Sequence, residues 1–357
     1  MRKIHYLDYL FLDTFSTKES RKLKSLYHIF TGKRTVSVMI QTLKYELGGY
    51  FGLFPKLKWD SFEKIIYLLF QEDLIFLVGE GYCITEKGVD QCTEYFQRHT
   101  RIKCFQQIRY VRMVPEFKKK SLFLVQVLSE MSHRNKDYFP LLEGLAEQNW
   151  LKSFLKSLTL PREEIPTTYG KEWISLLENL EINYKTIFVE QFEGTHYIRK
   201  TSRQVAEEYY LEESEVMIIW QQGWIQILDE LENHPNKYAI LYKLYHELKN
   251  KGYLWSNSVQ ETFLLLSNGV KPTDLSNRRH LKDSTINDHL TELALLSSSF
   301  PFEQFLNELQ INYVKRECSL DYREIQKEFP TISFFESRLM QVMSEVKKQD
   351  GKRLFRG

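Results

Sequence analysis

Apolar residues recur at helical spacing between residues 258 and 295, where they predict three consecutive short helices. Ser258 and Glu261 have the spacing at which a hydroxyl and a carboxylate satisfy each other's free backbone donors. The first helix is therefore predicted to start at Ser258. Gly269 is suited to the left-handed conformation that ends a helix. Thr273 is then placed to cap the second helix.

The third helix of this group has one apolar face and one polar face. The turn before it falls at His280, a residue type that tolerates positive φ better than most. Asp283 is placed to accept hydrogen bonds from the N–H groups that open the helix. The apolar stripe consists of Ile286, Leu290 and Leu293. The residues predicted to face outward are Ser284, Thr285, Asn287, Asp288 and Thr291. This pattern is typical of a helix-turn-helix motif.

Such a motif binds DNA by placing the helix that follows the turn, here the third helix of the group, in the major groove. The outward-facing residues would then meet base edges. The predicted phosphate contacts at the mouth of the groove are Arg278, Arg279 and Lys282. Against this interpretation, the segment 283–295 contains Asp283, Asp288 and Glu292 and no Lys or Arg. Two hypotheses therefore stay open: the helix reads DNA, or it docks a protein through Asp288 and Glu292.

The N-terminal third has a second organised pattern. Asp60 and Glu63 have capping-box spacing at the start of a helix. The apolar face of that helix consists of Phe62, Ile65, Ile66 and Leu69. Two β-rich runs follow, and the Gly-Glu-Gly at 79–81 that separates them predicts a hairpin. Thr85 then opens a helix that reaches about Arg98. Helix, hairpin and helix in this order predict a winged-helix domain.

The middle third is predicted to be helical from 121 to 158 and from 173 to 231. Residues 201–220 repeat the helix-turn-helix pattern in a weaker, acidic form that favours packing over DNA reading. Large aromatic residues of the middle third are predicted to lie in the core. They are Trp173, Trp220, Trp224 and Tyr242.

At 357 residues the chain is long enough for two or three domains. We predict a mainly α, multi-domain protein: a winged-helix-like domain over 1–118, a helical middle domain over 119–252, and a helix-turn-helix domain over 253–357. No apolar run approaches the ~18 residues needed to cross a bilayer. The N-terminus lacks the pattern of a signal peptide. A cytoplasmic protein, associated with the nucleoid if it binds DNA, is expected.

Net charge is unevenly distributed along the chain. Residues 1–120 hold 21 basic and 13 acidic residues, a net charge of +8, whereas 121–250 carry −7 and 251–357 carry +1. The N-terminal third is therefore the electrostatic candidate for nucleic acid. Its predicted phosphate contacts are Lys33, Arg34, Arg98, Arg101, Lys103, Arg109 and Arg112. The opposite charges of the first two segments could instead dock on each other.

Patterns of known catalysis are absent from the sequence. The four cysteines form no C-x-x-C pair, and no histidine belongs to an H-E-x-x-H sequence. The segment 31–35 resembles a phosphate-binding loop, but Tyr27 and Arg34 occupy positions that need Gly and Ser or Thr. We therefore predict a protein that is not an enzyme, with no cofactor and no metal.

A family resemblance adds to this. The stretches SVQETFLLLSNG, RRHLKDSTINDHLTELAL and DYREIQKEFPTISFFESRLM, over about 258–342, resemble the helicase-associated helix-turn-helix module of some RecQ-type helicases. The stretches GKRTVSVMIQTL, YFGLFPKLKWDSFEKIIYLLFQEDLI and YCITEKG are similar to the winged-helix domain of the same helicases. Together with the length, these stretches resemble the bacterial YpbB family. The wing departs from the RecQ pattern, because Gly-Glu-Gly replaces the strand-separating aromatic residue.

The resemblance implies an accessory protein of DNA recombination or repair. The first hypothesis is a DNA-binding factor that works with a RecQ-type helicase. The second is an adaptor that docks a helicase or a replication protein without binding DNA. The third is a transcriptional regulator, for which no dimerisation helix is evident in the sequence.

Overall fold

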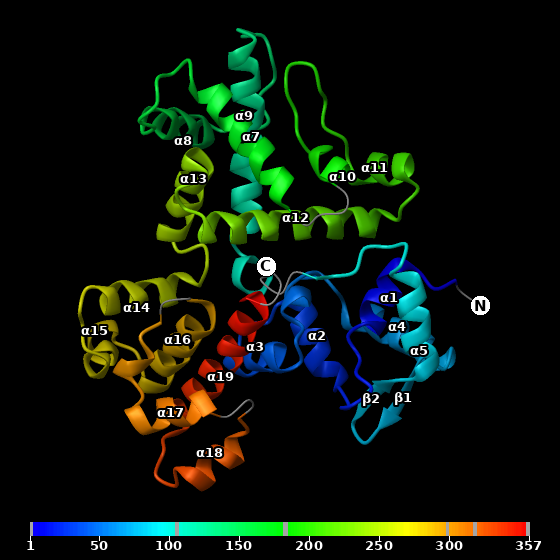
Figure 1. Ribbon diagram of the computed structural model, residues 1–357, viewed down its shortest axis with the longest axis vertical. Helices are drawn as coiled ribbons and strands as arrows, with labels where there is room; N and C mark the ends of the chain where they lie inside the picture. The colour runs from blue at the N-terminus through cyan, green and yellow to red at the C-terminus, as the bar shows by residue number, and fades with distance from the viewer. Residues whose placement is uncertain (1–2, 104–106, 181–184, 298–299, 317–319, 355–357) are drawn as a thin grey trace. The chain divides into compact units, whose positions relative to one another are not determined.

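A computed structural model describes residues 3–103, 107–180, 185–297, 300–316 and 320–354 (Figure 1). Over these residues the chain forms helices and one two-stranded hairpin, which confirms the predicted mainly α class. No helix in the described part of the chain is long and apolar enough to cross a membrane.

The chain divides into two compact units, and neither is continuous in sequence. The first consists of Met1–Tyr27 and Lys56–Lys251, and the second of His28–Pro55 and Gly252–Gly357. This division differs from the three predicted segments. The boundary near residue 252 is common to both, but residues 28–55 belong with the C-terminal unit, and no boundary falls near 118.

The N-terminal part of the first unit is built around the hairpin. Its elements are α1 (Tyr6–Leu12), the start of α2 (Leu23–Thr31), α4 (Trp59–Gln71), β1 (Ile75–Val78), β2 (Gly81–Ile84) and α5 (Glu86–Tyr95). The predicted apolar face of α4 is buried, as expected. The helix begins at Trp59 after Lys58, however, so the capping box at Asp60 and Glu63 is wrong. Lys58 is the last residue with extended backbone, which places Asp60 inside the first helical turn.

The hairpin forms where the sequence predicts it. Val78 pairs with Gly81 across a two-residue turn, and Gly79 takes a φ of +59°. A glycine at the first turn position allows this left-handed conformation without steric cost. The Thr85 hydroxyl accepts a hydrogen bond from Gly88 N at 3.0 Å, which confirms that Thr85 opens α5. The helix ends at Tyr95 rather than Arg98. The winged-helix interpretation of this part stays a prediction.

The rest of the first unit is a helical assembly around α12. Its elements are α6 (Gln107–Tyr110), α7 (Val114–Ser132), α8 (Leu145–Lys156), α9 (Ile165–Asn179), α10 (Lys185–Val189), α11 (Ser202–Tyr209), α12 (Glu213–Asn233) and α13 (Ala239–Asn250). Figure 1 shows α7 beside α9, with α12 running across their end. Trp224 of α12 is fully buried, and its ring centroid lies 5.9 Å from that of Trp173. These two tryptophans are core, as predicted, whereas Trp220 and Tyr242 are half-buried.

Acidic and amide side chains of α12 hold the N-terminal part to the middle helices. The fully buried Glu215 carboxylate accepts from Thr100 N at 2.7 Å and lies 2.7 Å from His99 Nδ1. Gln222 accepts from Lys103 N at 3.2 Å. Because a buried carboxylate must stay hydrogen-bonded, these contacts join the two predicted domains into one unit. This explains why the structure has no boundary near residue 118.

The second unit packs around its last helix. Its elements are α3 (Val36–Lys44), η1 (Gly48–Tyr50), α14 (Asn257–Ser267), η2 (Pro272–Asp274), α15 (Leu275–Arg279), α16 (Asp283–Leu296), η3 (Phe302–Gln304), α17 (Glu308–Arg316), α18 (Tyr322–Glu328) and α19 (Phe334–Leu354). The helix α19 contacts α16, α17 and α18, and also α3 from the N-terminal segment (Figure 1). Met39, Ile40 and Leu43 of α3 are buried. Segment 28–55 therefore supplies part of the core of this unit.

Two glycines of the first unit provide a matched test of the packing. A Cβ at Gly88 would lie 2.4 Å from the Leu74 carbonyl oxygen, whereas one at Gly170, inside α9, would meet nothing within 4 Å. We expect Gly88→Ala to lower the free energy of unfolding by about 2 kcal/mol through overpacking. We expect Gly170→Ala to raise it by about 1 kcal/mol, because alanine is the better helix former. Urea unfolding of both variants measures this. Equal effects would contradict the close approach of α5 to Leu74.

Candidate nucleic-acid interface

The candidate interface lies on α14, α15 and α16, whose first helix starts earlier than predicted. The Ser256 hydroxyl accepts from Val259 N at 3.3 Å, so Ser256 is the cap of α14. The predicted capping box at Ser258 and Glu261 is wrong. Residues three apart share one helix face, and both side chains instead contact Arg279.

The end of α14 follows the prediction. Gly269 takes a φ of +82°, its N–H donates to Leu266 O at 3.0 Å, and Val270 N–H donates to Leu265 O at 3.1 Å. These two bonds form a Schellman motif, which satisfies carbonyls that the helix leaves free.

The short helix α15 begins differently from the prediction. A 3-10 turn over Pro272–Asp274 precedes it, and the Thr273 hydroxyl lies 3.3 Å from Asp274 Oδ1. Thr273 is therefore inside the turn and is not the predicted cap. Pro272 fixes its own φ near the helical value, so the backbone starts to coil one residue before Thr273.

The turn between α15 and α16 falls at His280, as predicted. His280 has φ +52° and ψ +41°, in the left-handed region. Leu281 N–H donates to Ser276 O at 3.1 Å and closes the turn. The helix α16 then begins at Asp283, after the extended Lys282. Asp283 is not the predicted capping residue, because it is already helical. Its carboxylate lies in the first turn, where the helix dipole favours a negative charge.

Only the first turns of α16 face water. Ser284 and Asp288 are exposed, and Thr285 and Asn287 are partly exposed. The predicted apolar stripe is buried, with at most 3% of any of its three side chains exposed. Thr291 was predicted to face outward and this is wrong. It is 2% exposed and donates to Asn287 O at 2.7 Å, in the half of α16 where buried residues are continuous.

Arg34 and Glu292 bind each other inside the second unit. The Arg34 guanidinium lies 2.7 Å from Glu292 Oε1 and donates to Leu254 O at 3.2 Å. Both side chains are largely buried, with 17% and 11% exposed. The prediction of Arg34 as a phosphate contact is therefore wrong, and so is the prediction of Glu292 as a partner-binding residue. Each charge is already matched by the other.

Arg279 also acts within the motif. It donates to Ser258 O at 3.1 Å and to Ser258 Oγ at 3.0 Å, and it pairs with Glu261. Its predicted role at DNA phosphates is wrong, because these contacts direct the guanidinium onto α14. His289 lies beside it, half-buried, with Nδ1 2.9 Å from the Thr262 hydroxyl. Burial, and then the Arg279 charge, lower the pKa of His289. His289 is thus a half-buried histidine whose ring is held by the Thr262 hydroxyl.

Two of the predicted cations of the N-terminal third pair within the first unit. Arg109 is 8% exposed and lies 2.6 Å from Glu232 Oε1, so its predicted DNA contact is wrong. Burial pushes the pKa of Glu232 up, but the Arg109 charge and the Tyr110 hydroxyl outweigh it and lower the pKa. Arg101 is half-exposed and donates through two nitrogens to Asp13, at 3.0 and 2.6 Å.

The remaining predicted cations are exposed, and their role at DNA stays a prediction. They are Lys33, Arg98, Lys103, Arg112, Arg278 and Lys282. Of these, Arg278 and Lys282 flank His280 beside the exposed turns of α16. We call this surface the polar end of α16, and it consists of Arg278, Lys282, Asp283, Ser284, Thr285, Asn287 and Asp288. Its two cations and two carboxylates give it no net charge.

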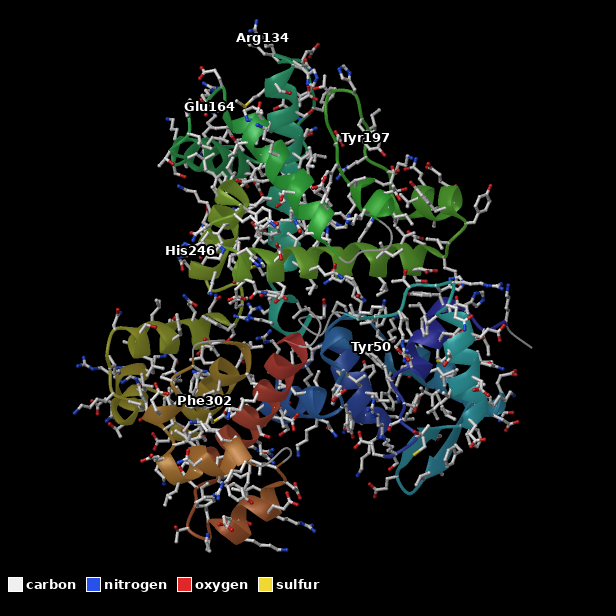
Figure 2. All side chains as sticks on the ribbon, in the orientation of Figure 1. Tyr50, Arg134, Glu164, Tyr197, His246 and Phe302 are labelled. Carbon is white, nitrogen blue, oxygen red and sulfur yellow. The ribbon has the colours of Figure 1, made fainter. Side chains whose placement is uncertain are left out.

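A second polar cluster lies near α10. Two adjoining pockets of about 400 and 500 Å³ share Val125, Ser129 and Phe192. Glu190 lines the larger one and accepts from Tyr209 at 3.1 Å and from Tyr197, which lies on the loop between α10 and α11 (Figure 2). Lys200 also pairs with it at 3.1 Å. Tyr197, Tyr209 and Lys200 thus hold Glu190, and these contacts fix the loop between α10 and α11.

The three helices and their left-handed turn define a protein with a helix-turn-helix domain. A family model described as a helix-turn-helix domain matches residues 258–341, which include α14 to α18 and the first turns of α19. The protein YpbB of Bacillus subtilis (strain 168) is 24% identical over 352 residues, which cover 94% of this chain and 97% of that protein. No solved structure matches the chain. The helix-turn-helix and the likeness to YpbB are thus confirmed, and the association with a helicase stays a prediction.

The pair of Arg34 and Glu292 can be tested by a mutant cycle. Arg34→Met or Glu292→Leu alone leaves the other charge buried and unpaired, which we expect to cost about 3 kcal/mol of unfolding free energy. The double variant Arg34→Met/Glu292→Leu should recover most of that loss. Among the described residues, Arg34 Nε and one terminal nitrogen find no hydrogen-bond partner, so the native pair is incompletely satisfied. Urea unfolding of all four proteins measures the coupling. Additive losses would contradict the pair.

Proposed function

We propose that this protein binds duplex DNA through the polar end of α16, without catalysing a reaction. The observation that carries the proposal is the geometry of the turn. His280, in the left-handed conformation, ends α15 and turns the chain into α16, and the first turns of α16 stay exposed while the rest is buried. In helix-turn-helix proteins the N-terminal residues of the second helix contact base edges.

The exposed side chains have suitable chemistry for this role. The hydroxyls of Ser284 and Thr285 donate and accept hydrogen bonds, and the amide of Asn287 can form a bidentate pair with adenine. Arg278 and Lys282, on the two sides of His280, are placed for phosphates. The region that reads bases is short, because α16 is buried from Leu290 onward except for Leu295.

The electrostatics limit the affinity. Asp283 and Asp288 offset the two cations of the polar end, and Arg279, the third predicted cation, is held by α14. Two phosphate contacts release few counterions, so we expect a shallow salt dependence, with a slope of about −2 in log–log form. This is shallower than a cluster of three or four free cations would give. Lys33, in the same unit, is exposed, and a phosphate contact from it would make the salt dependence steeper.

We further propose that the protein acts as an accessory of a RecQ-type helicase in recombination or repair. Support comes from the likeness of residues 258–342 to the helicase-associated module and from the helix-turn-helix match over 258–341. The alternative is an adaptor that does not bind DNA. In that case Asp288 is exposed and available to a partner protein, whereas Glu292 is already paired with Arg34.

Charge reversal at the polar end tests DNA binding. We expect Arg278→Glu/Lys282→Glu to abolish binding of labelled duplex DNA at low salt, and Asp288→Asn to strengthen binding by removing a repelled carboxylate. The matched control is Arg323→Glu/Lys327→Glu on α18, which makes the same charge change on exposed residues of the same unit. Fluorescence anisotropy at several salt concentrations measures both affinity and slope.

Equal losses in the two double variants would show that overall charge, not the polar end, governs binding. No binding by the unaltered protein at low salt would overturn the proposal in favour of the adaptor. The helicase association is tested separately, by sedimentation of the protein with a purified RecQ-type helicase. The adaptor hypothesis predicts that Asp288→Lys does not sediment with the helicase.

A further inference from the structure

The hairpin of the first unit has one paired edge and one open edge. Arg21 N–H donates to Tyr82 O at 2.9 Å and Tyr82 N–H donates to Arg21 O at 3.0 Å, so β2 is paired on both sides. The backbone groups of Tyr82 therefore point away from β1. Leu77 is the Cα partner of Tyr82, so its N–H and C=O point away from β2. Within the described residues, β1 has no further strand beside it.

The open edge is apolar. Phe76, Leu77 and Val78 are 45%, 57% and 41% exposed, so both faces of β1 and its edge meet water. Native proteins usually protect such an edge with Lys, Pro or a bulge. The sequence of β1, Ile-Phe-Leu-Val, contains none of these. An unprotected apolar edge of this kind indicates a surface that another chain covers.

The apolar surface continues from β1 onto α4. Leu77 lies opposite Tyr82, and the Tyr82 ring packs edge-on against Phe70, with centroids 6.3 Å apart. Tyr67, one turn before Phe70, is 66% exposed. The strip from Tyr67 to Leu77 is therefore continuous. We call it the hairpin strip, and it consists of Tyr67, Phe70, Leu77 and Tyr82.

Acidic residues border this surface. Asp73 precedes β1 and Glu80 follows it, and both are exposed. Glu63, one turn before Tyr67 on α4, is exposed as well. Glu80 pairs with Lys22, but both side chains are well exposed, and such a pair contributes little and can exchange partners. Carboxylates at the two ends of an apolar strand repel phosphates and attract Lys or Arg.

We propose that the open edge of β1 binds an extended segment of another protein, whose alternating apolar residues are bracketed by Lys or Arg. The segment adds a strand to the hairpin: it bonds to the Leu77 backbone and packs its apolar side chains on the hairpin strip. Its basic residues reach Asp73 and Glu80, which lie seven positions apart in the sequence. Only Ile75–Val78 between them is strand, so at about 3.3 Å per residue a bound segment needs roughly four residues between its basic ends. The hairpin strip belongs to the first unit and the polar end of α16 to the second, so the chain would join a protein to DNA.

The test uses the full chain and synthetic peptides. The probe is a fluorescent peptide of alternating Val and Thr with a lysine at each end, and the control peptide has glutamates in place of the lysines. We expect the lysine peptide to bind at least about tenfold more tightly than the glutamate peptide, a difference of about 1.4 kcal/mol. N-methylation of the central residues of the lysine peptide should abolish binding, because it removes the strand hydrogen bonds.

Protein variants locate the site. Leu77→Lys places a charge on the edge and should weaken lysine-peptide binding at least about tenfold. Asp73→Asn should weaken it less, and it suits the φ of +55° at this position because asparagine tolerates the left-handed region. The matched control is Ile198→Lys, the same kind of change on an 83% exposed residue of the same unit. Circular dichroism checks that each variant stays folded.

Several results would overturn the proposal. One is equal binding of the lysine and glutamate peptides, and another is binding that Leu77→Lys leaves unchanged. Failure of the lysine peptide to bind would also reject it. If the protein dimerises in sedimentation and Leu77→Lys abolishes the dimer, the edge is covered by a second copy instead. If Leu77→Lys abolishes binding of DNA, the edge belongs to a nucleic-acid surface.

Discussion

The ion pair between Arg34 and Glu292 connects the two parts of the second unit. The two residues lie 258 positions apart, and their contact fixes the segment 28–55 against α16. The buried apolar residues of α3 reinforce this contact, and α3 also touches α19. The exposed part of α16 is limited to its first turns, because its second half is buried. Separating the two segments or removing one partner would leave a buried charge unpaired, which costs free energy, so the pair favours this one arrangement of the segments.

Ion pairs within each unit also change what the net positive charge of the N-terminal third implies. The N-terminal third has the largest positive charge of the chain, yet Arg34 and Arg109 are matched by Glu292 and Glu232. Arg101 is matched by Asp13. The first unit uses the acids of α12 in the same way, to accept backbone N–H groups of the N-terminal part. The interpretation in which the oppositely charged segments dock on each other therefore describes the first unit better than a free basic surface does.

Within the described residues, the polar end of α16 and the hairpin strip both face water, and each has a distinct chemistry. The polar end of α16 combines hydroxyls, an amide and balanced charges, a set that suits base edges and a few phosphates. The hairpin combines an open strand edge, aromatic rings and acidic ends, a set that suits a basic and apolar protein segment. They differ because the carboxylates at the hairpin border an apolar strand edge, whereas those of the polar end of α16 lie among hydroxyls, an amide and two cations. A protein with both surfaces is suited to bring a partner to DNA.

Local features were predictable from the sequence because they depend on a few neighbouring residues. The apolar faces of α4 and α16, the glycine turn of the hairpin, the Thr85 cap and the left-handed His280 all follow from spacing and backbone preference. Helix starts were less predictable. Residues three apart, such as Ser258 and Glu261, can form a capping box or can lie on one helix face and hold a third side chain, here Arg279. The exposure of Arg34, Arg109, Thr291 and Glu292 was decided only by the tertiary structure. The partners that bury these groups come from elements far away in the chain, and a charge or hydroxyl is available to a ligand only where no such partner covers it.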